Sequence, residues 1–116
     1  MGTDAIELTS ENFEKRVLTD EQPFVAHFGA EWCEESTETA ELLDEVAEEY
    51  DGDVEIGRVD IDENTHLAND FRIQALPTLI FFHRGHVLRR LTGEITRTEL
   101  EEMFEQMDAV GRDDAA

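Results

Sequence analysis

Residues 24 to 36 read FVAHFGAEWCEES, and this stretch decides how the chain folds. Residues 24–28 are nearly all apolar strand formers, which is typical of a short strand buried on both faces. Residues 29–32 form a turn, and a long helix is predicted from about Cys33 to Tyr50. Its apolar residues Ala40, Leu43, Ala47 and Tyr50 fall on one stripe.

The segments on either side alternate between strand and helix patterns. Strands are predicted over residues 5–8, 54–60, 78–82 and 87–91, and helices over residues 10–18, 64–71 and 97–107, with caps at Ser10 and Thr96. Residues 51–53 end the long helix, residues 84–85 make a hairpin turn, and residues 108–116 are expected to fray. This order predicts parallel pairing among the first three strands and an antiparallel hairpin for the last two. The 116 residues suffice for one domain, residues 1–116 with a core over about 4–108.

The charge of the chain excludes several classes of partner. Thirty acidic residues against nine basic ones give a net charge of −21, which repels nucleic acid and anionic membranes. No apolar run is long enough to cross a membrane, and the N-terminal stretch lacks the features of a signal peptide, so we expect a cytoplasmic protein.

The acidic residues lie on helices with regular apolar stripes, so they belong to a folded surface. Molar salt would screen their mutual repulsion. The pattern is typical of halophilic proteins and predicts a salt-rich, haloarchaeal cytoplasm, with an ordinary acidic protein as the alternative.

Three separated motifs carry a family resemblance. They are FGAEWC at residues 28–33, VDIDEN at 59–64 and IQALPT at 73–78, and Gly85 and Gly93 fit the same pattern. With this spacing the chain resembles the thioredoxin family over about residues 4 to 108. The resemblance implies an α/β thioredoxin fold, a central mixed five-stranded sheet flanked by four helices.

The single cysteine departs from the family's Cys-Gly-Pro-Cys motif, because the chain has Cys33-Glu34-Glu35-Ser36. The resemblance makes Cys33 the attacking cysteine and puts Ser36 in place of the resolving one. A hydroxyl cannot displace sulfur at neutral pH, so a mixed disulfide should stall. A helix N-terminus favours a thiolate at Cys33, and Ser36, one turn on, is placed to donate a hydrogen bond to it. Glu34 and Glu35 stabilise the helix start but disfavour the thiolate as like charges.

His27 stands where the family carries an acid that moves protons for the resolving cysteine. We expect a neutral core histidine with hydrogen-bonded nitrogens. The alternative is a histidine that pairs with Cys33 or Ser36 and titrates near neutrality. No cofactor is expected, and no metal site, because no Cys/His pair has zinc-site spacing and the other histidines, His66, His83 and His86, are scattered.

A peptide-docking surface is implied by the resemblance around Pro77, the position of the family's cis-proline. Its role is to expose the backbone of Leu76 for strand-like pairing with a bound peptide. The expected substrate-binding residues are Trp32, Glu34, Glu35, Ile61, Leu76, Pro77 and Gly93.

Two functions of different classes follow. The first is single-cysteine exchange with protein disulfides or thiols and with low-molecular-weight thiols: mixed-disulfide formation, disulfide shuffling or deglutathionylation, with an external thiol releasing Cys33. The second is a redox-silent binding module with an inert Cys33. A third reading takes Ser36 as an engineered replacement that traps substrates. The protein is expected to be a monomer, or a dimer through Cys33 or through the apolar patch of Trp32, Ile61, Leu76, Pro77 and Gly93.

Overall fold

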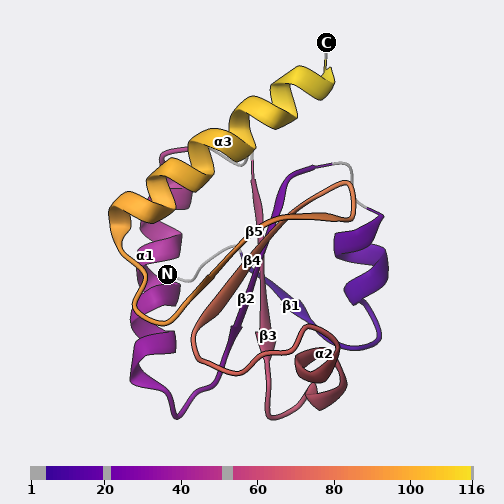
Figure 1. The fold of residues 1–116 in the computed structure, drawn as a ribbon, viewed down its shortest axis with the longest axis vertical. Helices are drawn as coiled ribbons and strands as arrows, with labels where there is room; N and C mark the ends of the chain where they lie inside the picture. The colour runs from indigo at the N-terminus through magenta and orange to yellow at the C-terminus, as the bar shows by residue number, and fades with distance from the viewer. Residues whose placement is uncertain (1–4, 20–21, 51–53, 116) are drawn as a thin grey trace.

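A mixed five-stranded sheet forms the centre of the fold, as predicted (Figure 1). The computed structural model describes residues 5–19, 22–50 and 54–115, so the helix stop predicted at 51–53 lies outside the described residues. The strands are β1 (Ile6–Leu8), β2 (Phe24–Gly29), β3 (Glu55–Asp60), β4 (Thr78–His83) and β5 (His86–Thr92). Their order is β1-β3-β2-β4-β5; β3 runs parallel to β1 and β2, and β4 runs antiparallel to β2 and β5.

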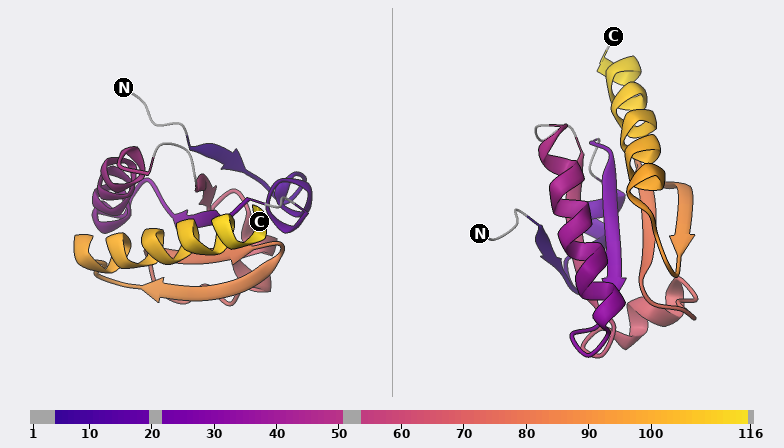
Figure 2. Two further views of the ribbon diagram at one scale, coloured as in Figure 1. Left: turned by 90° about the horizontal axis from the view of Figure 1, so that it is seen from above. Right: turned by 90° about the vertical axis from the view of Figure 1, so that its left-hand side faces the viewer.

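Helices cover both faces of this sheet. The α1 (Glu34–Glu48) and α3 (Arg97–Ala115) helices share one apolar core with the sheet, and the short π-helix η1 (Glu14–Leu18) shares a second core with α2 (Thr65–Asp70). Figure 1 shows the first pair to the left of the sheet and the second pair to its right. Figure 2 shows α3 lying along the β4–β5 hairpin. No helix among the described residues has the length and apolar character needed to span a membrane.

The β2 strand is buried along its whole length because it supplies both cores. Val25 packs into the core with α1 and α3, whereas Phe24 and Phe28 pack into the core with η1 and α2. This alternation is the period of two that a strand imposes on its side chains. The apolar run therefore fixes β2 at the centre of the sheet.

Two predicted helices have different bounds in the structure. Ser10 does not cap a helix over residues 10–18, because a turn precedes the five-residue η1. In that turn Thr9 and Asn12 bond each other reciprocally, one residue before the predicted cap: Thr9 Oγ1 accepts from the Asn12 N–H (3.3 Å), and the Thr9 N–H donates to Asn12 Oδ1 (2.8 Å). The α3 helix continues to Ala115, beyond the end predicted at Met107. Once a helix has begun, each further residue adds a hydrogen bond without needing an apolar stripe.

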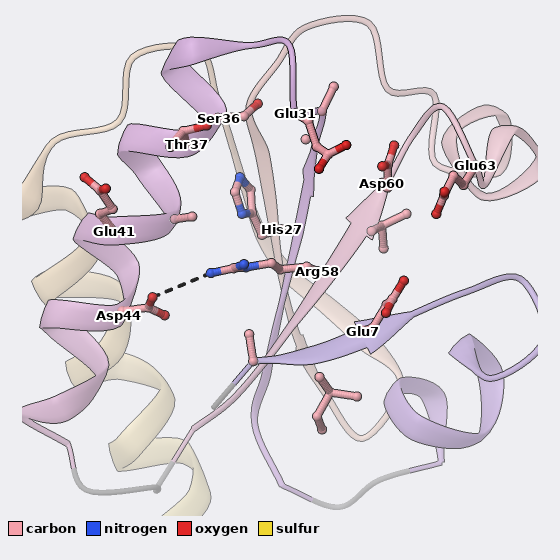
Figure 3. Close-up of a pocket in the computed structure, with 16 residues that line it drawn as sticks. Glu7, His27, Glu31, Ser36, Thr37, Glu41, Asp44, Arg58, Asp60 and Glu63 are labelled. Carbon is pink, nitrogen blue, oxygen red and sulfur yellow. Dashed lines mark ion pairs between the residues drawn. The ribbon is translucent and has the colours of Figure 1, made fainter. Parts of the chain in front are cut away.

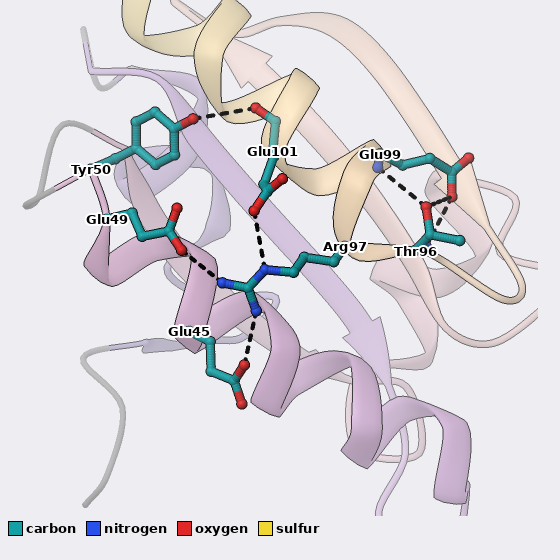
Figure 4. Close-up of polar contacts among 7 residues, drawn as sticks. All are labelled: Glu45, Glu49, Tyr50, Thr96, Arg97, Glu99 and Glu101. Atoms are coloured by element: carbon teal, nitrogen blue, oxygen red, sulfur yellow. Dashed lines mark hydrogen bonds and ion pairs between the residues drawn. The ribbon is translucent and has the colours of Figure 1, made fainter.

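The start of α3 is closed by a capping box and tied to α1 (Figure 4). Thr96 Oγ1 accepts from the Glu99 backbone N–H (3.2 Å), and Glu99 Oε1 accepts from the Thr96 backbone N–H (2.9 Å), which confirms the predicted cap. The Arg97 guanidinium contacts three carboxylates, at 3.0 Å from Glu45, 2.6 Å from Glu49 and 3.0 Å from Glu101. One arginine thus holds acidic residues of both helices together.

Candidate functional site

Strand register gathers the predicted site residues at one end of the sheet. Gly29 of β2 is level with Asp60 of β3, so the β2–α1 and β3–α2 loops leave the sheet side by side. Thr78 of β4 is level with Phe28 and also with Thr92 of β5. The chain before β4 and the chain after β5 therefore reach the same end, which is the lower end in Figure 1.

Cys33 is the N-cap residue of α1, as the sequence predicts. Its backbone N–H donates to the carbonyl of Ala30 (3.1 Å), and its own carbonyl accepts from the Thr37 N–H (3.2 Å). Its side chain accepts no capping hydrogen bond from the described residues, and only 9% of the residue is exposed. The influence of the helix on the thiol is therefore that of its dipole. Glu34 and Glu35 lie exposed in the first turn, as expected.

Ser36 is buried one turn further on, and its expected hydrogen bond to Cys33 is absent. The Oγ atom has no hydrogen-bond partner among the described residues, although the residue is only 3% exposed. The hydroxyl lies close to Gly29 instead. A Cβ at Gly29 would sit only 2.9 Å from Ser36 Oγ. The missing side chain of Gly29 is what gives the hydroxyl this position.

His27 is a neutral buried histidine, but neither predicted arrangement of its nitrogens occurs. Burial, and secondly the positive charge of Arg58, lower the pKa of His27 from its ordinary 6.5 to about 4. Both ring nitrogens lack a partner among the described residues, so the ring bonds neither Cys33 nor Ser36. The ring instead comes close to Gly29, where an added Cβ would lie 3.2 Å from His27 Nε2.

The expected docking residues form two groups. The first group is Trp32 and Ile61. Trp32 is 69% exposed, and its Nε1 donates to Asp62 Oδ2 (2.8 Å). Ile61 is next to Asp62 in the chain, and its N–H donates to the carbonyl of Gly29 (3.0 Å). The sequence analysis missed Asp62; its place in the VDIDEN motif beside Ile61 was the available signal.

The second group lies where β4 begins and β5 ends. The Leu76–Pro77 peptide is cis, as the resemblance implies, and the N–H of Gly93 donates to the Pro77 carbonyl (3.0 Å). Among the described residues, no atom lies within 4 Å of the position that a Cβ at Gly93 would take. This side of the site is therefore open.

A pocket of about 700 Å³ lies behind Ser36, between α1 and the β1–β3 edge of the sheet (Figure 3). His27 and Ser36 line it, and Arg58 crosses it towards Asp44, with 3.6 Å between Nη2 and Oδ2. Sequence reasoning did not find this pocket. Its signal is the set of small residues that leave the space open, Gly29, Ser36 and Ala40.

Metal ligands are not clustered in the part of the chain that the structure describes. No three His, Cys, Asp or Glu side chains there are close enough to hold one ion.

Comparison with known proteins agrees with this architecture. The family model described as Thioredoxin matches residues 4–106. The chain belongs to the thioredoxin family. It is 36% identical over 101 residues to the thioredoxin of Buchnera aphidicola subsp. Acyrthosiphon pisum, covering 87% of this chain and 94% of the relative. It is 30% identical over 102 residues to thioredoxin 1 of Nostoc, covering 88% and 95%.

A solved structure confirms the thioredoxin fold. Chloroplastic thioredoxin z matches with a TM-score of 0.81 and 30% identity, covering 94% of this chain and 98% of that one. Thioredoxins exchange thiols with protein disulfides, so the family places this chain among thiol–disulfide redox proteins.

Proposed function

We propose that this thioredoxin-family protein exchanges disulfides through Cys33 alone. The observation that supports this most is the position of its single cysteine, at the N-terminus of α1 and at the sheet end that also carries Trp32 and the cis Pro77. A thiolate at a helix N-terminus is stabilised by the helix dipole. Cys33 is the only catalytic residue in this proposal, because Ser36 and His27 make no hydrogen bond to it.

The reaction proceeds in two balanced exchanges. In the first, the Cys33 thiolate attacks one sulfur of a mixed disulfide between a protein and glutathione. The old S–S bond breaks, a Cys33–glutathione disulfide forms, and the protein leaves as a thiolate that takes up a proton. In the second, a glutathione thiolate attacks the glutathione sulfur of that adduct and releases Cys33 with oxidised glutathione. Two glutathione sulfurs thus supply the two electrons gained by the substrate thiol.

Ser36 limits the protein to this external route. A serine hydroxyl stays protonated at neutral pH, so it cannot attack the Cys33 sulfur of an adduct and expel the bound thiol as a thiolate. With a disulfide between two peptide cysteines, the same first step leaves a mixed disulfide that persists, or that a second peptide thiol resolves as shuffling. All three outcomes use Cys33 alone, and release from the adduct always requires a thiol from outside the protein.

Protein substrates would dock beside the cysteine. Leu76 lies just before β4, at the sheet end that carries Cys33, and its backbone would pair with a substrate segment in a strand-like manner. The open space at Gly93 and the exposed ring of Trp32 would flank that segment. Ile61, Glu34 and Glu35 complete the substrate surface in this proposal.

The working environment we propose is a salt-rich cytoplasm. Its support is the net charge of −21 on a folded domain. At 1 M salt the Debye length is about 3 Å, so repulsion between most surface carboxylates is screened. At low salt the same charges oppose the compact state.

A binding module without redox chemistry is the second candidate. It is favoured by the contrast between the 9% exposure of Cys33 and the 69% exposure of Trp32. In that case the docking surface would recognise peptides while the thiol stays unreactive.

The rate of deglutathionylation separates the two candidates. A peptide–glutathione mixed disulfide is incubated with glutathione in molar KCl, and free peptide thiol is followed by mass spectrometry. We expect the protein to accelerate release, Cys33→Ser to abolish the acceleration, and Glu38→Gln, an exposed change further along α1, to keep it. Release at the uncatalysed rate would refute the exchange function in favour of the binding module.

A further inference from the structure

The inner end of the pocket behind Ser36 holds two buried polar groups that have no partner. His27 is 4% exposed and Ser36 is 3% exposed, and neither ring nitrogen nor Ser36 Oγ hydrogen-bonds any described residue. Buried polar groups are normally hydrogen-bonded, and leaving one unpaired is costly. Ser36 Oγ and His27 Nε2 lie 2.9 Å and 3.2 Å from the position that a Cβ at Gly29 would take, so the two atoms are at most about 6 Å apart, the sum of the two distances, close enough for one hydrogen-bonding atom between them to contact both. One small ligand group can therefore reach both.

This inner end suits a neutral group that both donates and accepts. A neutral imidazole offers one N–H and one lone pair, and a hydroxyl offers both functions as well. An ammonium there would bring an unpaired charge into a buried position, which is unfavourable. A hydroxyl on the ligand fits both His27 and Ser36.

The rim of the pocket is strongly acidic. Five carboxylate residues line it besides the Asp44–Arg58 pair: Glu7, Glu31, Glu41, Asp60 and Glu63. In Figure 3 the carboxylates of Glu31 and Asp60 lie on the far side of His27 from α1. A positive charge on the ligand would be attracted here, and a carboxylate on it would be repelled.

Short aliphatic side chains form the wall between these two regions. Ala40 of α1 faces the pocket from one side, and Ile6 and Val59 line it from β1 and β3. A chain of a few methylene groups can lie against these residues. The pocket volume of about 700 Å³ is in the usual range for small-molecule sites.

We propose that this pocket binds a small aliphatic amino alcohol, with its hydroxyl between His27 and Ser36 and its ammonium among the rim carboxylates. The binding needs no reaction at Cys33, so it does not depend on the exchange function. His27 and Ser36 make no hydrogen bond to Cys33, and in this proposal their role is to bind the ligand.

The test is a titration of the full chain with 4-aminobutan-1-ol, followed by two-dimensional NMR at low ionic strength. Pentylamine replaces the hydroxyl by a methyl group, and pentan-1-ol replaces the ammonium. The variants are Ser36→Ala, which removes one inner partner, and Glu31→Gln, which removes a rim charge. Glu38→Gln removes the same charge from α1 outside the pocket, and Cys33→Ala removes the thiol.

We expect saturable binding of 4-aminobutan-1-ol at about millimolar concentration, with shifts in the His27 ring signals. Loss of one hydrogen bond should weaken it about three- to tenfold, both with pentylamine and with Ser36→Ala. Glu31→Gln should weaken it more than Glu38→Gln, and Cys33→Ala should leave it unchanged. Equal binding of pentylamine, equal effects of the two Glu→Gln changes, or no saturable shift at His27 would each overturn the proposal in favour of diffuse attraction to an acidic surface.

Discussion

Gly29 is the residue on which the local geometry of the site depends. Its lack of a side chain lets Ser36 Oγ and His27 Nε2 approach the backbone at the end of β2. Neither polar group makes a hydrogen bond to Cys33 or to another described residue. His27, at the position where the family carries an acid that moves protons, is thus a neutral ring that lines a pocket.

His27 should make the protein less stable as the pH falls. Its pKa is about 4 in the folded state against 6.5 ordinarily, so between these values the unfolded state binds the extra proton. The contribution is absent above pH 6.5 and grows as the pH falls to 4, to roughly 3 kcal/mol.

Urea unfolding of the parent and of His27→Leu at pH 7 and pH 4 in molar KCl measures this effect. The carboxylates are common to both proteins, so their titration cancels in the difference. The parent should lose roughly 3 kcal/mol relative to the variant between the two pH values. Parallel pH profiles would show that His27 is not the group responsible.

Individual elements follow from the sequence wherever an apolar period is present. The β2 strand, the α1 helix and the β4–β5 hairpin with its turn at Arg84–Gly85 all lie where their patterns predict them. The predicted cap at Ser10 is wrong because Thr9, paired with Asn12, takes the capping position one residue earlier. The predicted end of α3 at Met107 is wrong because a helix can extend through polar residues that have no apolar periodicity.

The contact between α1 and α3 should depend on Arg97. Hydrogen bonds to Glu101 first, then to Glu49 and Glu45, raise the pKa of Arg97, which marks it as their shared cation. Without it, three carboxylates of two packed helices would repel each other. We expect Arg97→Gln to lower the thermal midpoint by a few degrees at low salt and by less in molar KCl.

Arg89→Gln serves as the matched control for this change. It removes the same charge from an exposed position on β5, for which the structure gives no ion pair with a described residue. Equal midpoints for the two variants at low salt would show that the carboxylate cluster is not held by Arg97.

For the whole molecule, the net charge of −21 predicts a stability that increases with salt. Screening shortens the Debye length from about 10 Å at 0.1 M to about 3 Å at 1 M. The thermal midpoint at pH 7 should therefore rise through this range of KCl. At pH 4, where many carboxylates are protonated, the rise should be smaller. A midpoint at pH 7 that stays flat or falls with KCl would argue against a salt-rich working environment.

The sequence predicts the fold and the cysteine position better than it predicts the site's interior. Linear motifs locate Cys33 and the residues proposed for docking, because each motif lies next to a strand end and the sheet brings those ends together. The pocket has no linear motif, since it arises where small residues of β2 and α1 leave space beside β3. The direction of the His27 and Ser36 side chains depends on packing between those elements, so the spacing of the two residues in the sequence does not predict it.

The central claim, that one cysteine acts without an internal resolving group, is tested most directly by counting released thiols. The reduced protein is mixed with excess substrate disulfide whose two halves differ in mass, with no other thiol present. The parent should release one half per protein and retain the other on Cys33, whereas Ser36→Cys should release both halves and end as an internal disulfide. Addition of glutathione should free the adduct of the parent. Release of both halves by the parent without added thiol would contradict the account.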